Sequence, residues 1–62
     1  MNNIDKIRAK KNMSYVDIGE KAGITAQYVS MLAKGSRENP SLEVMKAIAD
    51  ALGVKVNKVF DI

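Results

Sequence analysis

The 62-residue chain contains no cysteine, no histidine and no tryptophan, and only one proline. Without cysteine it can form neither a disulfide nor a thiolate metal site, and without histidine it lacks the commonest metal ligand and the usual general base. No apolar run approaches the ~20 residues that cross a bilayer, and the N-terminus does not resemble a signal peptide. We therefore expect a cytoplasmic protein with no cofactor, no metal and no membrane contact.

The chain is also too short to form a large core, and its net charge is small. A chain of this length forms one domain, residues 1–62, and buries only about 60% of the surface that its unfolded form exposes. Since no disulfide can stabilise so small a core, we expect a dimer. The formal net charge of +3 permits nucleic-acid binding without demanding it.

The middle of the chain, from Ser14 to Gly35, has the pattern of two short helices joined by a tight turn. Ser14 stands three residues before Asp17, the spacing of a capping box, and Thr25 can cap the second helix in the same way. Gly23 stands where the first helix must stop, because glycine enters the left-handed conformation without a Cβ clash. Two capped helices around a glycine stop predict a helix-turn-helix.

The second of these helices has two different faces. At about 100° per residue, Val29, Leu32 and Ala33 fall on one side and would face a core. The opposite side, mostly polar and uncharged, holds Gln27, Ser30, Met31 and Lys34. Such a face suits the edges of DNA bases, although an ordinary solvated helix can show the same pattern.

A further helix is predicted before this unit, from residue 2 or 3 to residue 11. Asn3 is its expected N-cap, and Ile4 and Ile7 line its inner side. Asn12 can adopt the left-handed conformation that ends it.

Two more helices are predicted after the unit. Pro40 should hold Asn39 in an extended conformation, which keeps the preceding loop from being helical. Ser41 then caps a helix over residues 42–52. The inner stripe of that helix is Leu42, Met45, Ile48, Ala49 and Leu52. A last short helix, over about residues 55–60, turns toward the core with Val56, Val59 and Phe60.

With these elements assembled, the chain resembles the phage lambda repressor and Cro-like helix-turn-helix family of bacterial and phage regulators. The residues at the positions that define the two-helix unit are Ile18, Gly19, Gly23, Val29 and Leu32. Segments 39–42 and 48–54 look like the family's fourth helix and its exit, and Arg8 matches a common arginine in the first helix. The resemblance implies an all-α, compact five-helix fold, bacterial or phage-encoded, whose third helix enters the DNA major groove.

The resemblance also implies two sets of DNA-contacting residues. The base-contacting set is Thr25, Ala26, Gln27, Tyr28, Ser30 and Met31. The phosphate-contacting set is Tyr15, Lys34, Ser36, Arg37 and Asn39. Gln27 is the strongest candidate, because a glutamine amide can pair bidentately with adenine. The alternative is that these side chains are merely solvated, with Lys34 or Arg37 paired to Glu38.

Three positions depart from the family pattern. Tyr15 replaces a common glutamine, although its hydroxyl can still reach a phosphate. Ala33 replaces a common glutamate, so Arg8 must turn instead to Asp5, another acid or a phosphate. Lys55 stands where Ser or Thr commonly caps the fifth helix, so that helix is expected to fray.

These features favour a sequence-specific transcriptional regulator, a repressor that binds a palindromic operator in double-stranded DNA as a homodimer. The family's dimer surface commonly involves the last helices or the tail, where the candidates are Val54, Asn57, Lys58 and Ile62. Because the chain has no second domain to sense a small-molecule ligand, we expect repression by occluding the polymerase.

Three other functions are alternatives to DNA binding. A protein-interaction module of the same fold, such as an antitoxin or anti-regulator partner, would use the outward Met31 and Tyr28. RNA binding is weaker, because the chain has few aromatic side chains on which bases could stack. An enzyme is not expected: the carboxylates of Asp17 and Glu20 lie one turn apart, but they are better explained as a cap and a surface residue.

Overall fold

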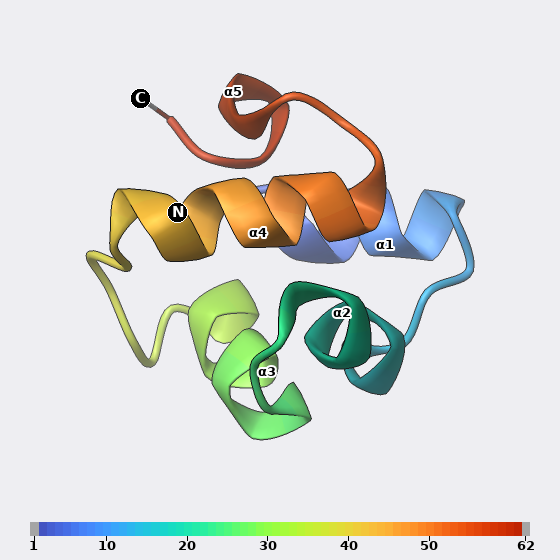
Figure 1. Cartoon of the computed structure of the whole chain (residues 1–62), viewed down its shortest axis with the longest axis horizontal. Coiled ribbons are helices and arrows are strands. Elements are labelled where there is room, and N and C mark those ends of the chain that lie inside the picture. The colour runs from blue at the N-terminus through green and yellow to red at the C-terminus, as the bar shows by residue number, and fades with distance from the viewer. Residues whose placement is uncertain (1, 62) are drawn as a thin grey trace.

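The computed structural model describes residues 2–61, which fold into five α-helices with no strand between them. They are α1 (Ile4–Lys10), α2 (Tyr15–Ala22), α3 (Ala26–Lys34), α4 (Leu42–Leu52) and α5 (Val56–Val59). In Figure 1, α4 crosses the middle of the molecule, with α5 on one side, α2 and α3 on the other, and α1 behind it. The predicted all-α, five-helix fold with a helix-turn-helix at α2 and α3 is confirmed. None of the helices within residues 2–61 is long and apolar enough to cross a membrane.

Local sequence signals fix both ends of the turn between α2 and α3. Ser14 Oγ accepts a hydrogen bond from the N–H of Asp17 at 3.0 Å, and the Asp17 carboxylate accepts one from the N–H of Ser14 at 2.9 Å. Thr25 Oγ1 accepts from the N–H of Tyr28 at 3.0 Å, and Gly23 ends α2 with a left-handed φ of 76°. The predicted capping box, second cap and glycine stop are therefore all present.

Gly19 brings α2 against the turn that follows it. A Cβ at this position would lie 2.6 Å from the carbonyl oxygen of Ile24 and 3.1 Å from the backbone nitrogen of Ala26. Because both neighbours are backbone atoms, no side-chain rotation could relieve the overlap. Glycine is required here by close packing rather than by an unusual φ.

The core draws on every helix, and its apolar side chains hold α3 against the rest of the molecule. The side chains with less than 2% of their surface exposed are Ile4, Ile18, Val29, Leu32, Ile48, Leu52 and Val59. Phe60 is also buried, and Val56 packs against the core from the start of α5, as predicted. The prediction for Leu42 is wrong, since 51% of its surface is exposed. It begins α4 beside the exposed loop at 36–39, beyond the helices that cover the rest of the stripe.

Two asparagines, Asn39 and Asn3, differ from their predicted roles. Asn39 is not extended but has a φ of 56°. Asparagine tolerates this left-handed region better than most residues, and the return of the chain into α4 overrides the preference that Pro40 imposes. Asn12, with the same φ of 56°, ends α1 as predicted.

Asn3 precedes α1 but does not cap it with its side chain. Its side-chain amide instead donates to the carbonyl of Lys58 at 3.0 Å, and its N–H donates to the carbonyl of Val59 at 2.8 Å. The side-chain oxygen of Asn2 accepts from the N–H of Ile4 at 3.0 Å. The start of the chain is thus fastened to α5, a long-range contact that no local pattern indicated.

Candidate nucleic-acid interface

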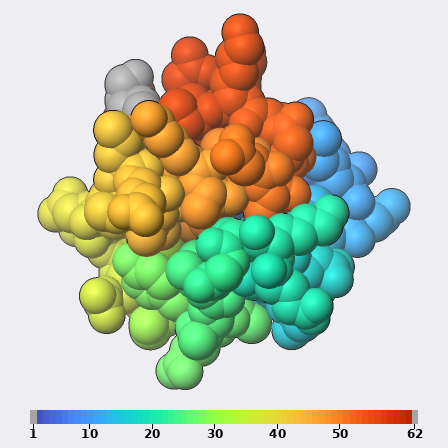
Figure 2. Space-filling view, viewed as in Figure 1, coloured from blue at the N-terminus to red at the C-terminus, as the bar shows by residue number. Residues whose placement is uncertain are grey.

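The outer side of α3 carries the predicted row of polar side chains. Val29, Leu32 and Ala33 are buried beneath it. Gln27 and Lys34 are exposed, whereas Ala26, Tyr28, Ser30 and Met31 are half-buried. The two-faced helix is as predicted, although Met31 lies less open than a purely outward position implies. In the space-filling view, α2 and α3 form one projecting edge of the molecule, coloured teal to green (Figure 2).

Thr25 both caps α3 and belongs to the predicted base-contacting set. Thr25 is exposed and its hydroxyl accepts the N–H of Tyr28, so the residue fixes the first turn of α3. The last turn of α3 is held from elsewhere, because the side-chain amide of Asn2 donates to the carbonyl of Leu32 at 2.8 Å. The first turn of α3 is therefore capped and its last turn is tied to Asn2, while the buried Val29, Leu32 and Ala33 seat the helix on the core.

The loop after α3 brings together the exposed polar residues predicted to contact phosphates. Gly35 turns the chain with a left-handed φ of 82°. The N–H groups of Ser36 and Arg37 both donate to the carbonyl of Met31, at 2.9 and 3.2 Å. The loop therefore starts folded back onto the end of α3, with the side chains of Lys34, Ser36, Arg37 and Asn39 exposed.

Arg37 does not form the alternative pair with Glu38. Within residues 2–61, the ion pair between Arg8 and Asp5 is the only one. The Arg37 guanidinium instead lies over the ring of Tyr28, 5.5 Å from its centroid. Sequence reasoning missed this contact, because the two residues are joined by a glycine turn and not by helical spacing.

Tyr15 forms a cluster with Asp5 and Arg8 that links α1 to α2. Its hydroxyl donates to Asp5 Oδ1 at 2.6 Å, and the same oxygen accepts from Arg8 Nε at 2.8 Å. The Arg8 guanidinium also stacks on the Tyr15 ring, 4.3 Å from its centroid, and Arg8 Nη1 donates to the carbonyl of Met13 at 3.4 Å. Of the three partners open to Arg8, the structure selects Asp5. A phosphate contact by the Tyr15 hydroxyl would require its bond to Asp5 to break.

The electrostatics of this cluster reinforce its geometry. The hydrogen bond from Tyr15, followed by the bond and charge of Arg8, lowers the pKa of Asp5. The positive charge of Lys34, at the end of α3, lowers the pKa of Asp5 further. The hydrogen bond that Tyr15 makes to Asp5 raises the pKa of Tyr15, and the one that Arg8 makes to Asp5 raises the pKa of Arg8. The carboxylate therefore stays ionised, and holds both partners, to a lower pH than an ordinary aspartate.

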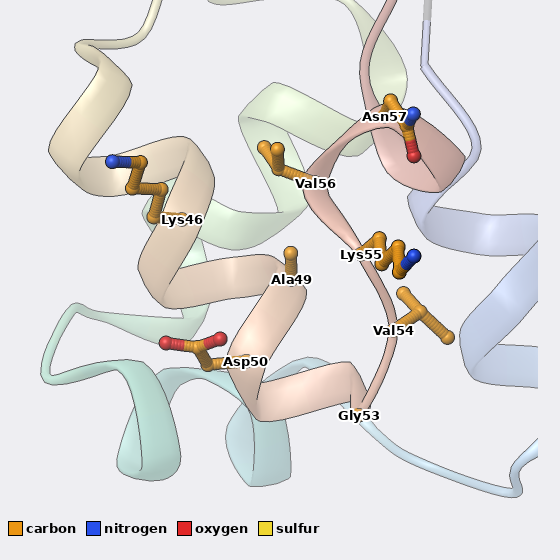
Figure 3. Close-up of a pocket in the computed structure, with 8 residues that line it drawn as sticks. All are labelled: Lys46, Ala49, Asp50, Gly53, Val54, Lys55, Val56 and Asn57. Carbon is orange, nitrogen blue, oxygen red and sulfur yellow. The ribbon is translucent and has the colours of Figure 1, made fainter.

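A shallow hollow between α4 and α5 contains part of the predicted dimer surface (Figure 3). Its lining residues are Lys46, Ala49, Asp50, Gly53, Val54, Lys55, Val56 and Asn57. Of these, Val54 and Asn57 belong to the predicted dimer surface. Lys58 is exposed on α5 outside the lining, and Ile62 lies outside the described residues. Among residues 2–61, no group of three acidic, histidine or cysteine side chains could hold a metal ion.

Comparison with known proteins adds a family assignment to this geometry. Residues 4–59 match the model of the family described as Helix-turn-helix. The immunity repressor protein of Bacillus phage phi105 is 34% identical over 56 residues, which are 90% of this chain and 38% of that protein. The HTH-type transcriptional regulator SinR is 29% identical in Bacillus subtilis (strain 168) and 28% in Bacillus licheniformis. Each SinR match covers 94% of this chain and 52% of the relative, so the chain spans 38% to 52% of its relatives' length.

Proposed function

The chain belongs to the helix-turn-helix family, and on that premise we propose that it is a sequence-specific DNA-binding transcriptional regulator. It acts as a repressor in the bacterial cytoplasm and binds a palindromic operator as a homodimer, with α3 in the major groove. The relatives are named as a repressor and as transcriptional regulators, which supports a role in regulation and not in catalysis.

The observation that carries the proposal is the fixed, two-faced α3 at a projecting edge of the molecule. Its inner side is sealed by Val29, Leu32 and Ala33, while the amide of Gln27 and the ammonium of Lys34 are exposed. The major groove is about 12 Å wide and accepts one α-helix. A helix held at both ends and bearing hydrogen-bonding groups on its free side suits that groove.

The two predicted sets of residues make different contacts with DNA. Gln27 reads adenine through its amide, Ser30 adds a less discriminating hydrogen bond, and Met31 with Ala26 packs against a thymine methyl. Thr25 and Tyr28 lie beside these residues. Phosphate contacts come from the remaining set, which fixes the position of the protein without reading sequence. That set is Lys34, Ser36, Arg37 and Asn39, together with Tyr15 once its hydroxyl leaves Asp5.

Dimerisation through the α4–α5 side would place two copies of α3 in successive major grooves, about 34 Å apart. The hollow bounded by Val54 and Asn57 supports this side as the contact, and Lys58 flanks it on α5. A dimer bound across a promoter would repress by excluding the polymerase.

Selection of bound duplexes from a random DNA pool tests the proposal directly. We expect a two-fold symmetric consensus. Titration of the selected duplex over a range of salt should show log affinity falling linearly with log salt, by about 0.9 per neutralised phosphate. Failure to enrich any sequence, or an affinity indifferent to salt, would remove DNA binding from consideration.

Two substitutions separate DNA binding from the protein-interaction alternative. Gln27→Ala removes a base contact and Lys34→Ala a phosphate contact, so the double variant should lose at least tenfold in affinity for the selected duplex. Lys6→Ala, which removes an exposed positive charge from α1, is the matched control. If the double variant instead bound the duplex as well as the control does, α3 would not be the recognition helix.

A further inference from the structure

The chain contains two arginine–tyrosine contacts of different character. Arg8 stacks on Tyr15, and two of its nitrogens donate within the protein, Nε to the Asp5 carboxylate and Nη1 to the Met13 carbonyl. Arg37 lies over the Tyr28 ring, but its guanidinium forms no hydrogen bond or ion pair with any residue in the range 2–61. The first arginine is therefore held by partners within the protein. The second orients a cation whose donors have no partner among residues 2–61.

The backbone also favours one position for Arg37. Its N–H, like that of Ser36, donates to the carbonyl of Met31, and Gly35 turns the chain back at this point. From this anchored start the Arg37 side chain reaches back along α3 to Tyr28, more than two helical turns earlier in sequence. Tyr28 is itself half-buried and stands in the first turn of α3, which Thr25 caps.

A contact through the face of an aromatic ring suits a cation that has a second partner. The attraction comes from the ring's electron cloud and uses none of the guanidinium N–H groups. Those donors remain available in the fork geometry that matches two phosphate oxygens. Restricting the side chain before binding also lowers the entropy that is lost when the phosphate is engaged.

We propose that Tyr28 is a positioning residue, which holds the Arg37 guanidinium beside α3 so that it clamps a DNA phosphate at the edge of the groove. Tyr28 then contributes through its ring and not by reading a base with its hydroxyl. The inference rests on the proposed DNA binding, and it specifies how one phosphate contact of that interface is organised.

The stack can be tested without DNA. Ring-current shifts of the Arg37 side-chain protons, measured by nuclear magnetic resonance, report whether the guanidinium and Cδ lie over the ring. These shifts should persist in Tyr28→Phe and vanish in Tyr28→Leu, with both variants retaining the wild-type thermal unfolding midpoint to within a few degrees. Absence of the shifts in the wild-type protein would overturn the inference and leave the proposed function intact.

A double-mutant cycle, measured as affinity for the selected duplex, tests whether Tyr28 positions Arg37. Arg37→Ala should weaken binding about tenfold and reduce the slope of log affinity against log salt by about 0.9, whereas Lys6→Ala should leave that slope close to the wild-type value. Tyr28→Leu should weaken binding about two- to fivefold in the wild-type background. In the Arg37→Ala background it should have no further effect, because the ring then has nothing to position.

The conservative variant distinguishes the two possible roles of Tyr28. Tyr28→Phe keeps the ring and should retain the affinity that Tyr28→Leu loses. If Tyr28→Phe binds as weakly as Tyr28→Leu, the hydroxyl contacts DNA itself and the positioning role is wrong. Independent, additive effects of Tyr28→Leu and Arg37→Ala would overturn it equally. Failure of the wild-type chain to bind any duplex would instead count against the proposed function.

Discussion

Gly19 has a hydrogen atom where other residues have a Cβ, and this lets α2 lie close to the start of α3. In an unconstrained helix, replacing glycine by alanine stabilises by about 0.5–1 kcal/mol. Here the added Cβ would meet the Ile24 carbonyl oxygen at 2.6 Å, so the backbone must shift. We expect Gly19→Ala to lower the free energy of unfolding by about 1–3 kcal/mol, measured by urea denaturation. A stabilised variant would show that the turn yields easily and that the close approach is unimportant.

Tyr15 determines the acidity of Asp5. The folded-state pKa of Asp5 is lowered, mainly by the Tyr15 hydroxyl, so this carboxylate contributes stability above its unfolded pKa of about 3.9. That contribution is lost as the pH falls through the folded-state pKa. Tyr15→Phe should raise the pKa of Asp5 toward its ordinary value, as followed by carboxyl nuclear magnetic resonance during an acid titration.

Asp17 is the internal control for that titration. Its pKa is lowered by hydrogen bonds from the Ser14 backbone and side chain, which do not involve Tyr15. The Asp17 curve should therefore be the same in both proteins. An unchanged Asp5 curve in Tyr15→Phe would mean that Arg8 alone holds the carboxylate.

Individual helices show which parts of this fold are encoded locally. Ser41 Oγ accepts from the N–H of Val44 at 3.1 Å and begins α4. Ser41→Ala should lower the free energy of unfolding by about 1 kcal/mol, read from the denaturant midpoint. Ser36→Ala is the matched control, because this exposed serine caps no helix. Equal effects of the two substitutions would show that the cap is not what stabilises α4.

The same distinction explains what the sequence could predict. Helix starts and glycine stops depend on residues three or four positions apart, so the serine and threonine caps of α2, α3 and α4 were read correctly. The roles of Asn3 and Asn39 were not, because one depends on α5 and the other on the path of a loop. In the candidate site, the outer face of α3 followed from helical periodicity. The Tyr28–Arg37 and Tyr15–Asp5 contacts join different elements, and no spacing rule indicated them.

In the proposed dimer, the contact between the two copies is the side formed by α4 and α5. In a two-fold interface, a residue near the axis meets its own copy, so a charge introduced there repels itself. Asn57→Arg should therefore weaken self-association, measured by sedimentation equilibrium, and weaken binding to a palindromic duplex more than to a single half-site. Ala9→Arg adds the same charge at an exposed position of α1 and serves as the control. Equal association of the two variants would place the dimer contact elsewhere.

The bonds from Asn3 to Lys58 and Val59 have a consequence for biosynthesis. They join positions 55 and 56 residues apart, so they cannot form until nearly all of the described chain has left the ribosome. The start of α1 therefore lacks these two bonds until α5 has been synthesised. A nascent chain stalled before residue 58 would consequently lack the tie that joins Asn3 to α5.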